Sequence, residues 1–323
     1  MHRASRGRLT AIALAALCAI FLTNAALSTP VVLVYGFQPV PGFYPPQLWA
    51  EIAESLAGRD LVDVERLSLD TSHVLYRLRS ADDAHRDVFI SDYAVAYELF
   101  VRDLRYYAAR LADEIAWILD EEGVDSVDIV AFSLGALVAR CYVEAADFNP
   151  VSGTVSFPEY GTEYRGDVGT LVTMAAPHHG AQFAALGPWF GPLPRQLEPG
   201  SAFLAILNRG EEAAPFGVNP DVRYVSLAGQ SCLGFGCSVR SDVEACRSEC
   251  VREALAWQGH DLVVLMSSAR LPGAEHVACV GMDHIEMRTH PAIVAELADL
   301  LAGESVPDAL FATEELAQAA ESD

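Results

Sequence analysis

The segment VDIVAFSLGALVAR, residues 127–140, decides the fold of this chain. Its first part, Val127–Phe132, is an apolar and β-branched run that is typical of a strand buried on both faces. From Leu134 onward the apolar residues have helical spacing, so we expect a helix over residues 134–146. Only Ser133 joins the two elements. The segment therefore predicts a sharp strand-to-helix turn with a serine at its tip.

The residues two before and two after this serine are Ala131 and Gly135. Such a turn needs small side chains at both places, because the strand and the helix pass close to each other. The turn would lift the Ser133 hydroxyl above the sheet and set it at a helix N-terminus, where negative charge is favoured. Ser133 is therefore the expected nucleophile.

The rest of the chain alternates strand and helix patterns. Strands are expected at 31–34, 88–90, 169–175, 222–228 and 276–280, and helices at 47–58, 104–119, 203–208 and 293–301. Residues 63–69 and 74–78 alternate in part, which predicts a short hairpin. This order indicates an α/β protein with a mostly parallel sheet and helices on both faces. The acidic, Ala-rich tail after Gly303 is expected to be a frayed helix or disordered.

A serine nucleophile needs a base, and the base needs an acid that orients it. In folds with this turn the chain order is serine, then acid, then histidine. His284 stands after the last expected strand and before the last helix, so it is the expected base. Asp261 stands between the strand at 222–228 and the final strand, and it is the preferred acid. The competing carboxylates are Asp242, Glu244 and Glu253.

An acyl-transfer site also needs two hydrogen-bond donors for the developing oxyanion. One is expected to be the backbone N–H of Leu134, directly after the nucleophile. The other is expected from the loop that follows the first strand, where Gly36 permits the required backbone conformation and Phe37 supplies the N–H.

Together these features resemble the α/β-hydrolase superfamily, and more narrowly its secreted bacterial lipases and esterases. The matching stretches are Val31–Phe37, Ala131–Gly135, Leu171–Gly180, Asp261 and His284. The resemblance implies an α/β-hydrolase fold and hydrolysis of carboxylic esters, above all lipid or acyl esters, through an acyl-serine intermediate. It implies no cofactor and no catalytic metal. Two positions depart from the usual pattern: Tyr35 replaces a common histidine, and Ala131 replaces a common glycine.

The resemblance also suggests where substrate lies. The segment LVTMAAPHHG, residues 171–180, is similar to a turn of such lipases, so His178 and His179 are expected at the pocket mouth, with a purely structural turn as the alternative. The expected substrate contacts are Tyr35, His178, His179, Trp189 and Phe190. Residues of about 60–100 and 183–216 are expected to form cap insertions with an acyl-accepting groove, or else ordinary packing.

Composition sets further limits. The 323 residues are 52% hydrophobic, which suits one large domain over residues 30–303. The formal net charge of −23 opposes nucleic-acid binding, because phosphate backbones are repelled. The expected partner is a lipid or acyl-ester substrate, with contact to a membrane surface. Oligomeric state is left open.

The N-terminus and the cysteines point to export. Residues 1–29 combine arginines with an apolar run from Leu9 to Leu22, the pattern of a signal peptide, with an uncleaved membrane anchor as the alternative. The protein is therefore expected to be secreted or periplasmic. Four cysteines cluster in a loop at 231–250, which predicts two disulfides rather than a zinc site. They are Cys232, Cys237, Cys246 and Cys250.

Three functions remain open from sequence. A lipase or carboxylesterase is preferred. A thioesterase or acyltransferase would use the same three residues, because an acyl-serine can be discharged to water or to another nucleophile. A catalytically silent hydrolase fold that acts as a binding protein is the third, and it is disfavoured because serine, acid and base all occur in order.

Overall fold

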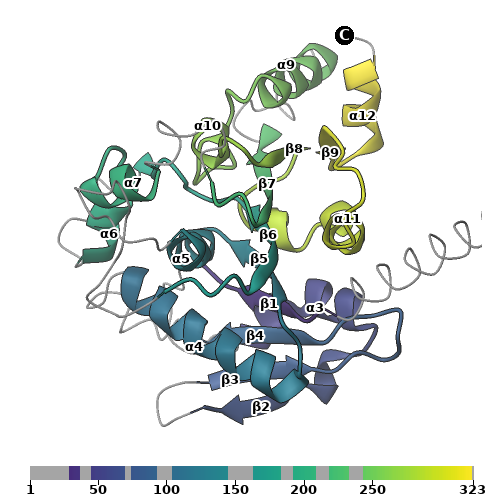
Figure 1. Ribbon diagram of the computed structural model, residues 1–323. Helices are drawn as coiled ribbons and strands as arrows, with labels where there is room; N and C mark the ends of the chain where they lie inside the picture. Colours follow the sequence, from purple (N-terminus) through teal and green to yellow (C-terminus); the bar gives the residue numbers. More distant parts are fainter. Residues whose placement is uncertain are drawn as a thin grey trace, which may run out of the picture.

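A computed structural model describes residues 29–36, 45–69, 74–92, 104–144, 163–182, 192–208, 218–232 and 243–321. Within these ranges nine strands form one sheet, in the order β2-β3-β4-β1-β5-β6-β7-β8-β9 (Figure 1). The strands are β1 Val31–Val34, β2 Glu65–Ser68, β3 Val74–Leu78, β4 Val88–Asp92, β5 Val127–Phe132, β6 Val168–Met174, β7 Arg223–Gln230, β8 Glu275–Val280 and β9 Ala309–Phe311. Every neighbouring pair from β4 to β9 is parallel.

Helices cover both faces of this sheet, as the sequence predicts (Figure 1). One face packs against α4 (Leu104–Glu122), α5 (Leu134–Val143) and α7 (Ala202–Leu207). The other face packs against α3 (Ala50–Ala57) and α11 (Pro291–Leu301). Short helices α2 (Pro45–Leu48) and α6 (Pro192–Gln196) stand beside α3 and α7. None of the described helices is long and apolar enough to cross a bilayer, and the expected signal or anchor lies outside the described residues.

The expected cap at about 60–100 is wrong over most of its length. Residues 65–92 instead extend the central sheet, since β2 pairs antiparallel with β3, and β3 pairs antiparallel with β4. The hairpin predicted for this stretch is confirmed, but its apolar residues Leu75, Tyr76 and Leu78 are buried in the two main cores. These side chains therefore belong to the core around the sheet and do not form a cap.

The tail after Gly303 is also ordered, contrary to the expectation of fraying. Its residues form β9, which pairs parallel with β8, and helix α12 (Glu314–Glu321). Leu316 of α12 is buried in a third core, together with residues of helix α9 (Val243–Leu255). The tail thus closes one edge of the sheet (Figure 1).

Helix α9 also corrects the expected cysteine loop, because residues 243–250 of that loop are helical. Cys250 on α9 forms a disulfide with Cys232, which follows β7, and Cys246 is disulfide-bonded as well. The disulfide prediction is confirmed over the zinc alternative, since bonded sulfurs are not thiolate ligands. Cys141 and Cys279 are buried and outside any disulfide, as expected for core residues.

A buried ion pair ties the amino-terminal edge of the sheet together. Arg86 donates from Nη1 to Oδ2 of Asp128 at 2.5 Å and from Nη2 to the carbonyl of Leu301 at 2.9 Å. The amide of Thr170 donates to Oδ1 of Asp128 at 2.8 Å. Burial raises the pKa of Asp128, and the Arg86 charge opposes that rise. One guanidinium thus links β5, the end of α11 and the turn before β4.

We predict that Arg86→Met destabilises the fold by about 3–5 kcal/mol, because it leaves the Asp128 carboxylate buried without its counter-charge. Without Arg86, burial raises the pKa of Asp128 further above its value in the unfolded chain. As pH rises, the buried carboxyl group must ionise at a cost that the unfolded chain does not have, so the free energy of unfolding falls. The loss should therefore be larger near pH 7 than near pH 4, measured by urea unfolding.

The control is Arg79→Met, since Arg79 is half exposed and pairs with Asp87 and Glu122 at the surface. Exposed pairs contribute about 0–1 kcal/mol. Equal losses in the two variants would contradict a special role for the buried pair.

Candidate active site

Ser133 lies at the carboxyl end of β5 and directly before α5, with backbone angles φ 53° and ψ −123°. A positive φ is costly for a residue with a Cβ, and it persists only where the surroundings enforce it. The Ser133 amide donates to the carbonyl of Met174 on β6 at 2.8 Å, which holds the turn against the sheet. The predicted strand–serine–helix turn is present.

Two glycines allow this turn. A Cβ on Gly135 would lie 2.5 Å from the carbonyl oxygen of Val34 and would also clash with that of Tyr35. A Cβ on Gly36 would lie 2.8 Å from the Cβ of Ser133. Real Cβ atoms do not approach so closely, so the end of β1 and the start of α5 need glycine at both places.

A continuous hydrogen-bond chain joins Ser133, His284 and Asp261. Nε2 of His284 is 3.0 Å from Oγ of Ser133, and Nδ1 of His284 is 2.7 Å from Oδ2 of Asp261. A carboxylate only accepts, so Nδ1 carries the proton and Nε2 keeps a lone pair that faces the serine hydroxyl. The structure brings together the three residues that were selected from sequence, and we call them the Ser–His–Asp relay.

The surroundings fix the acid and the base in place. Oδ1 of Asp261 accepts from the amides of Val263 at 2.9 Å and Val264 at 2.6 Å. The backbone carbonyl of Asp261 accepts from the amide of His284 at 2.9 Å. Both carboxylate oxygens are thus hydrogen-bonded, and the Asp261 side chain is buried. The ring of Phe132 packs against the His284 ring at 4.9 Å. Such support restricts the orientation of the imidazole.

One expected oxyanion donor is well placed. Leu134 is the first residue of α5, where an amide has no partner within its helix. The Cβ position of Gly36 lies 3.3 Å from the Leu134 nitrogen, so the loop after β1 passes beside this amide. Phe37, the second expected donor, lies outside the described residues, as do the expected substrate contacts Trp189 and Phe190.

Tyr35, directly after β1, is largely buried. It is buried against Trp49 and Phe132, at ring distances of 6.1 and 5.7 Å, and the Arg288 guanidinium lies over its ring at 5.4 Å. Burial raises the pKa of its hydroxyl, and Arg288 opposes the rise. These contacts give Tyr35 a packing role, and its contact with substrate stays a prediction. The residue packs beneath the turn and supports Phe132.

His178 is also a structural residue, because its side chain is fully buried and cannot line a pocket mouth. Its Nδ1 lies 3.4 Å from a nitrogen of Arg140, and its Nε2 lies 3.1 Å from Oγ1 of Thr173. Burial, with the Arg140 charge, holds the His178 pKa well below its usual range, so the ring is neutral. Asn208 at the end of α7 accepts from Arg140 at 2.9 Å and donates to the His178 carbonyl at 2.8 Å.

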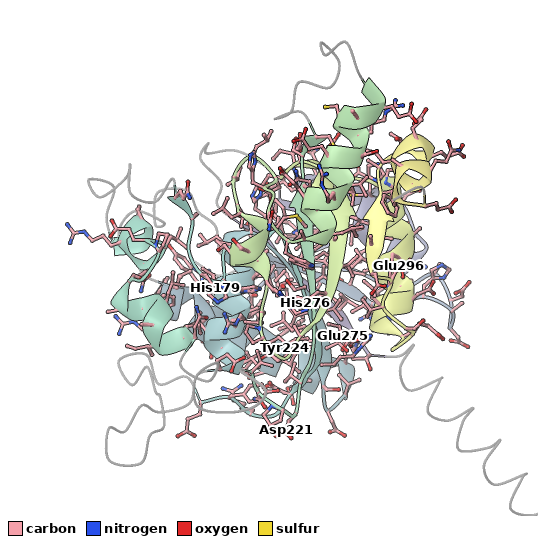
Figure 2. All side chains as sticks on the ribbon, turned by 90° about the horizontal axis from the view of Figure 1, so that it is seen from above. His179, Asp221, Tyr224, Glu275, His276 and Glu296 are labelled. Atoms are coloured by element: carbon pink, nitrogen blue, oxygen red, sulfur yellow. A yellow bond between two sulfur atoms is a disulfide. The ribbon has the colours of Figure 1, made fainter. Side chains whose placement is uncertain are left out.

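His179, labelled in Figure 2, is only partly buried. Its amide donates to Oγ of Ser268 at 3.2 Å, and its Nδ1 lies 3.2 Å from the Ser268 carbonyl. Ser268 belongs to α10 (Met266–Ala269), which follows the Asp261 turn. Both histidines thus make contacts of the kind expected for a structural turn, and the position of His179 at the pocket mouth stays a prediction.

Sequence reasoning missed Gly229 on β7. A Cβ there would lie 2.9 Å from the Cβ of Asp261 and from the carbonyl of Met282, and 3.0 Å from Sδ of Met287. Gly229 therefore lets the acid segment and the base segment lie close together. The available signal was a glycine inside an apolar strand, which often marks such a close approach.

Part of the chain matches a known protein family. Residues 68–193 match a family described as "Putative serine esterase (DUF676)". This match includes Ser133 but neither Asp261 nor His284. No curated protein sequence matches the chain significantly.

Two solved structures share its architecture. Lipase BlEst2 of Bacillus licheniformis, in its mature form, is 18% identical with a TM-score of 0.53, over 85% of this chain and 92% of its own. The product of the lin2722 gene of Listeria innocua is 13% identical with a TM-score of 0.53, over 88% and 98% of the two chains. The chain has an α/β-hydrolase fold. At these identities the likeness concerns the fold, and the chemistry must be argued from the site.

We predict that Gly229→Ala lowers kcat for ester hydrolysis by at least about 10-fold, because the added methyl would push Asp261 away from His284. The measurement is steady-state kinetics together with thermal unfolding of the variant.

Gly123→Ala is the control, since a Cβ at Gly123 meets nothing within 4 Å although φ is 66°. It should reduce stability by about 1 kcal/mol and leave kcat unchanged. An unaltered kcat in Gly229→Ala would contradict the proposed need for this close approach.

Proposed function

We propose that this protein is a serine hydrolase that cleaves carboxylic esters through an acyl-serine intermediate. The single observation that carries the proposal is the hydrogen-bonded Ser133–His284–Asp261 relay at a strand-to-helix turn. The match of residues 68–193 to a serine esterase family supports it further.

In the first half-reaction, Oγ of Ser133 attacks the ester carbonyl carbon while Nε2 of His284 takes the hydroxyl proton. The imidazolium that forms is stabilised by the Asp261 carboxylate at Nδ1. The carbonyl oxygen becomes an oxyanion beside the Leu134 amide, and Phe37 is the proposed second donor. When the carbon–oxygen bond to the alcohol breaks, Nε2–H returns its proton to the leaving alkoxide.

The second half-reaction repeats these steps with water. Nε2 of His284 takes a proton from water, the hydroxide attacks the acyl carbon, and the bond to Oγ of Ser133 breaks with return of the proton to Oγ. The products are an acid and an alcohol, and the enzyme is restored.

We predict that Ser133→Ala and His284→Ala each lower kcat for p-nitrophenyl butyrate by about 10⁶-fold, and that Asp261→Asn lowers it by about 10⁴-fold. The three losses should be strongly non-additive, because the residues act as one unit.

Glu253→Gln is the matched control, because Glu253 competed with Asp261 for the acid role and lies on α9. Its kcat should equal that of the parent. A large loss in Glu253→Gln with none in Asp261→Asn would contradict the acid assignment, and full activity in His284→Ala would contradict the base.

We further propose that the ester carries a long acyl chain, as in lipids. Support comes from the apolar segment between Phe183 and Leu197 and from helix α7, whose Phe203, Leu204 and Leu207 belong to the same apolar core as α5. We predict that kcat/KM rises from acetate to octanoate across a nitrophenyl ester series, because a longer chain removes more apolar surface from water. A steep preference for acetate would contradict a lipid substrate.

Export is proposed for the same protein. The basic and apolar pattern of residues 1–29 supports a signal peptide or anchor, and the Cys232–Cys250 disulfide supports an oxidising compartment.

A further inference from the structure

Large apolar side chains are exposed beside the Ser–His–Asp relay. Leu262 and Val263 follow Asp261 and are 43% and 39% exposed, and Ile285 follows His284 and is 53% exposed. Among the described residues, the other large apolar side chains with such exposure are Val62 and Leu255. We call Leu262, Val263 and Ile285 the apolar rim.

The rim residues lie at the same edge of the sheet as Ser133. Strands β5, β7 and β8 run parallel, and the segments that carry Ser133, Asp261 and His284 all follow the carboxyl ends of these strands. The Asp261 carbonyl accepts from the His284 amide at 2.9 Å, so the two rim-bearing segments are direct neighbours. Ligands of α/β folds approach this edge.

The backbone conformation at Leu262 is unusual for a leucine. Leu262 has φ 79° at the first position of a two-residue turn, in which the Asp261 amide donates to the Val264 carbonyl at 3.1 Å. Turns with positive φ at this position favour Gly, Asn or Asp, so a Leu there carries a conformational cost. Such a cost points to a contact outside the molecule.

Ile285 is presented rigidly too. The Asp283 carboxylate accepts from the amides of Ile285 at 2.8 Å and of Glu286 at 2.9 Å, and the Asp283 amide donates to Glu286 at 2.8 Å. This pair of reciprocal bonds fixes the backbone around Ile285. The exposed side chain is therefore held outward by the chain that positions His284.

The chemistry of the rim selects its partner. Aliphatic side chains offer no hydrogen bonds, and specific protein partners usually bury about 800 Å² on each side, far more than three side chains supply. A fluid apolar phase requires no matching shape. The net charge of −23, with the exposed Glu286 beside Ile285, opposes an anionic surface.

We propose that Leu262, Val263 and Ile285 insert into the surface of an uncharged or zwitterionic lipid phase and hold the relay against it. The benefit to catalysis rests on the proposed function, whereas the binding itself does not require Ser133 chemistry. Binding is therefore tested in a Ser133→Ala background, which consumes no lipid and stays informative if the esterase proposal fails.

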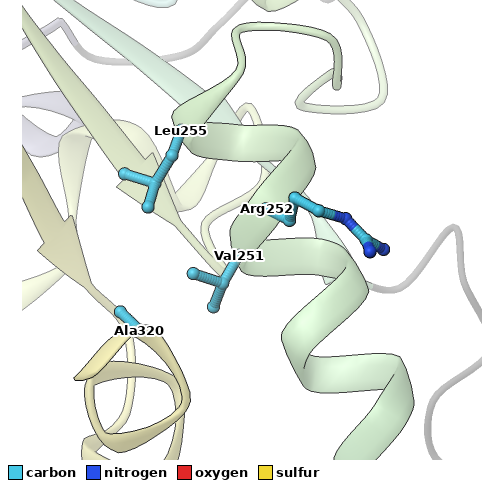
Figure 3. A pocket seen from close by; sticks show the side chains of 4 residues that line it. All are labelled: Val251, Arg252, Leu255 and Ala320. Carbon is cyan, nitrogen blue, oxygen red and sulfur yellow. The ribbon is translucent and has the colours of Figure 1, made fainter. Parts of the chain in front are cut away.

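The other two exposed side chains need no such partner. Val62 precedes β2 at the amino-terminal edge of the sheet, opposite the relay, because β2 runs in the direction of β4 and β1. Leu255 lines a groove of 390 Å³ between α9 and α12, where Leu255 and Val251 point toward Ala320 while Arg252 points away (Figure 3). Val62 is 88% exposed and therefore serves as the matched control.

The experiment places an environment-sensitive nitrobenzoxadiazole label at Val263→Cys or at Val62→Cys of the Ser133→Ala protein after removal of the proposed signal segment, residues 1–29, which would itself bind lipid. Cys141 and Cys279 are buried and will not compete for the label. With phosphatidylcholine vesicles we expect a blue shift and a severalfold emission gain at position 263 and no change at position 62. Phosphatidylglycerol vesicles at low salt should give a weaker response.

Adding Leu262→Asn and Ile285→Ser to the Val263-labelled protein should raise the midpoint lipid concentration at least about 15-fold, since each buried methylene strengthens transfer about fourfold. Leu262→Asn should also raise the melting temperature, because Asn tolerates the positive φ. A silent label at position 263, an equal response at position 62, stronger binding to phosphatidylglycerol, or an unchanged midpoint would each overturn the proposal.

Discussion

The backbone at Ser133 is the constraint on which the rest of the site depends. A residue with a Cβ is held at φ 53° between a buried strand and a helix, and this is tolerated because its neighbours leave no alternative. Gly135 passes the end of β1, Gly36 passes the Ser133 side chain, and the Met174 carbonyl binds the Ser133 amide. Three strands thus meet at one residue. The same arrangement directs the hydroxyl away from the sheet and sets the Leu134 amide beside it.

The acid and the base reach that hydroxyl because β7 and β8 are paired in register and end at the same edge. The insertion between β7 and α10 is long, and the Cys232–Cys250 disulfide and the packing of α9 against α12 hold it to the sheet. Asp261 emerges from it into a tight turn whose amides satisfy one carboxylate oxygen and leave the other for His284. The geometry of the relay is therefore a property of strand ends and turns, which explains why a glycine of β7 matters to it.

Sequence predicted the parts of this protein whose signals are local. Buried parallel strands are continuous apolar runs, so β1, β5 and β6 were found close to their true ends, and the turn at Ser133 was evident from small residues around one serine. The relay partners followed from chain order. The pairing of β9 at the sheet edge was not predictable in the same way, because β9 is short and helix α11 separates it in sequence from its partner β8.

The buried position of His178 was not predictable for a related reason. Tyr35 and His178 are residue types that often contact ligands, but burial decides their role, and burial depends on three-dimensional packing. Arg140 and Asn208 contact the polar atoms of His178, in the turn at residues 177–180. Trp49, Phe132 and Arg288 pack around Tyr35. Conversely, local backbone preference alone would predict glycine or asparagine, and not leucine, at position 262.

The central claim is that Ser133 is a nucleophile activated by His284 and Asp261. Its most direct test is peptide mass spectrometry after reaction of the native protein with a fluorophosphonate. We predict one phosphonyl adduct, on the peptide that contains Ser133, and its loss when the protein is denatured before reaction. An adduct on another residue, or equal labelling of native and denatured protein, would contradict the claim.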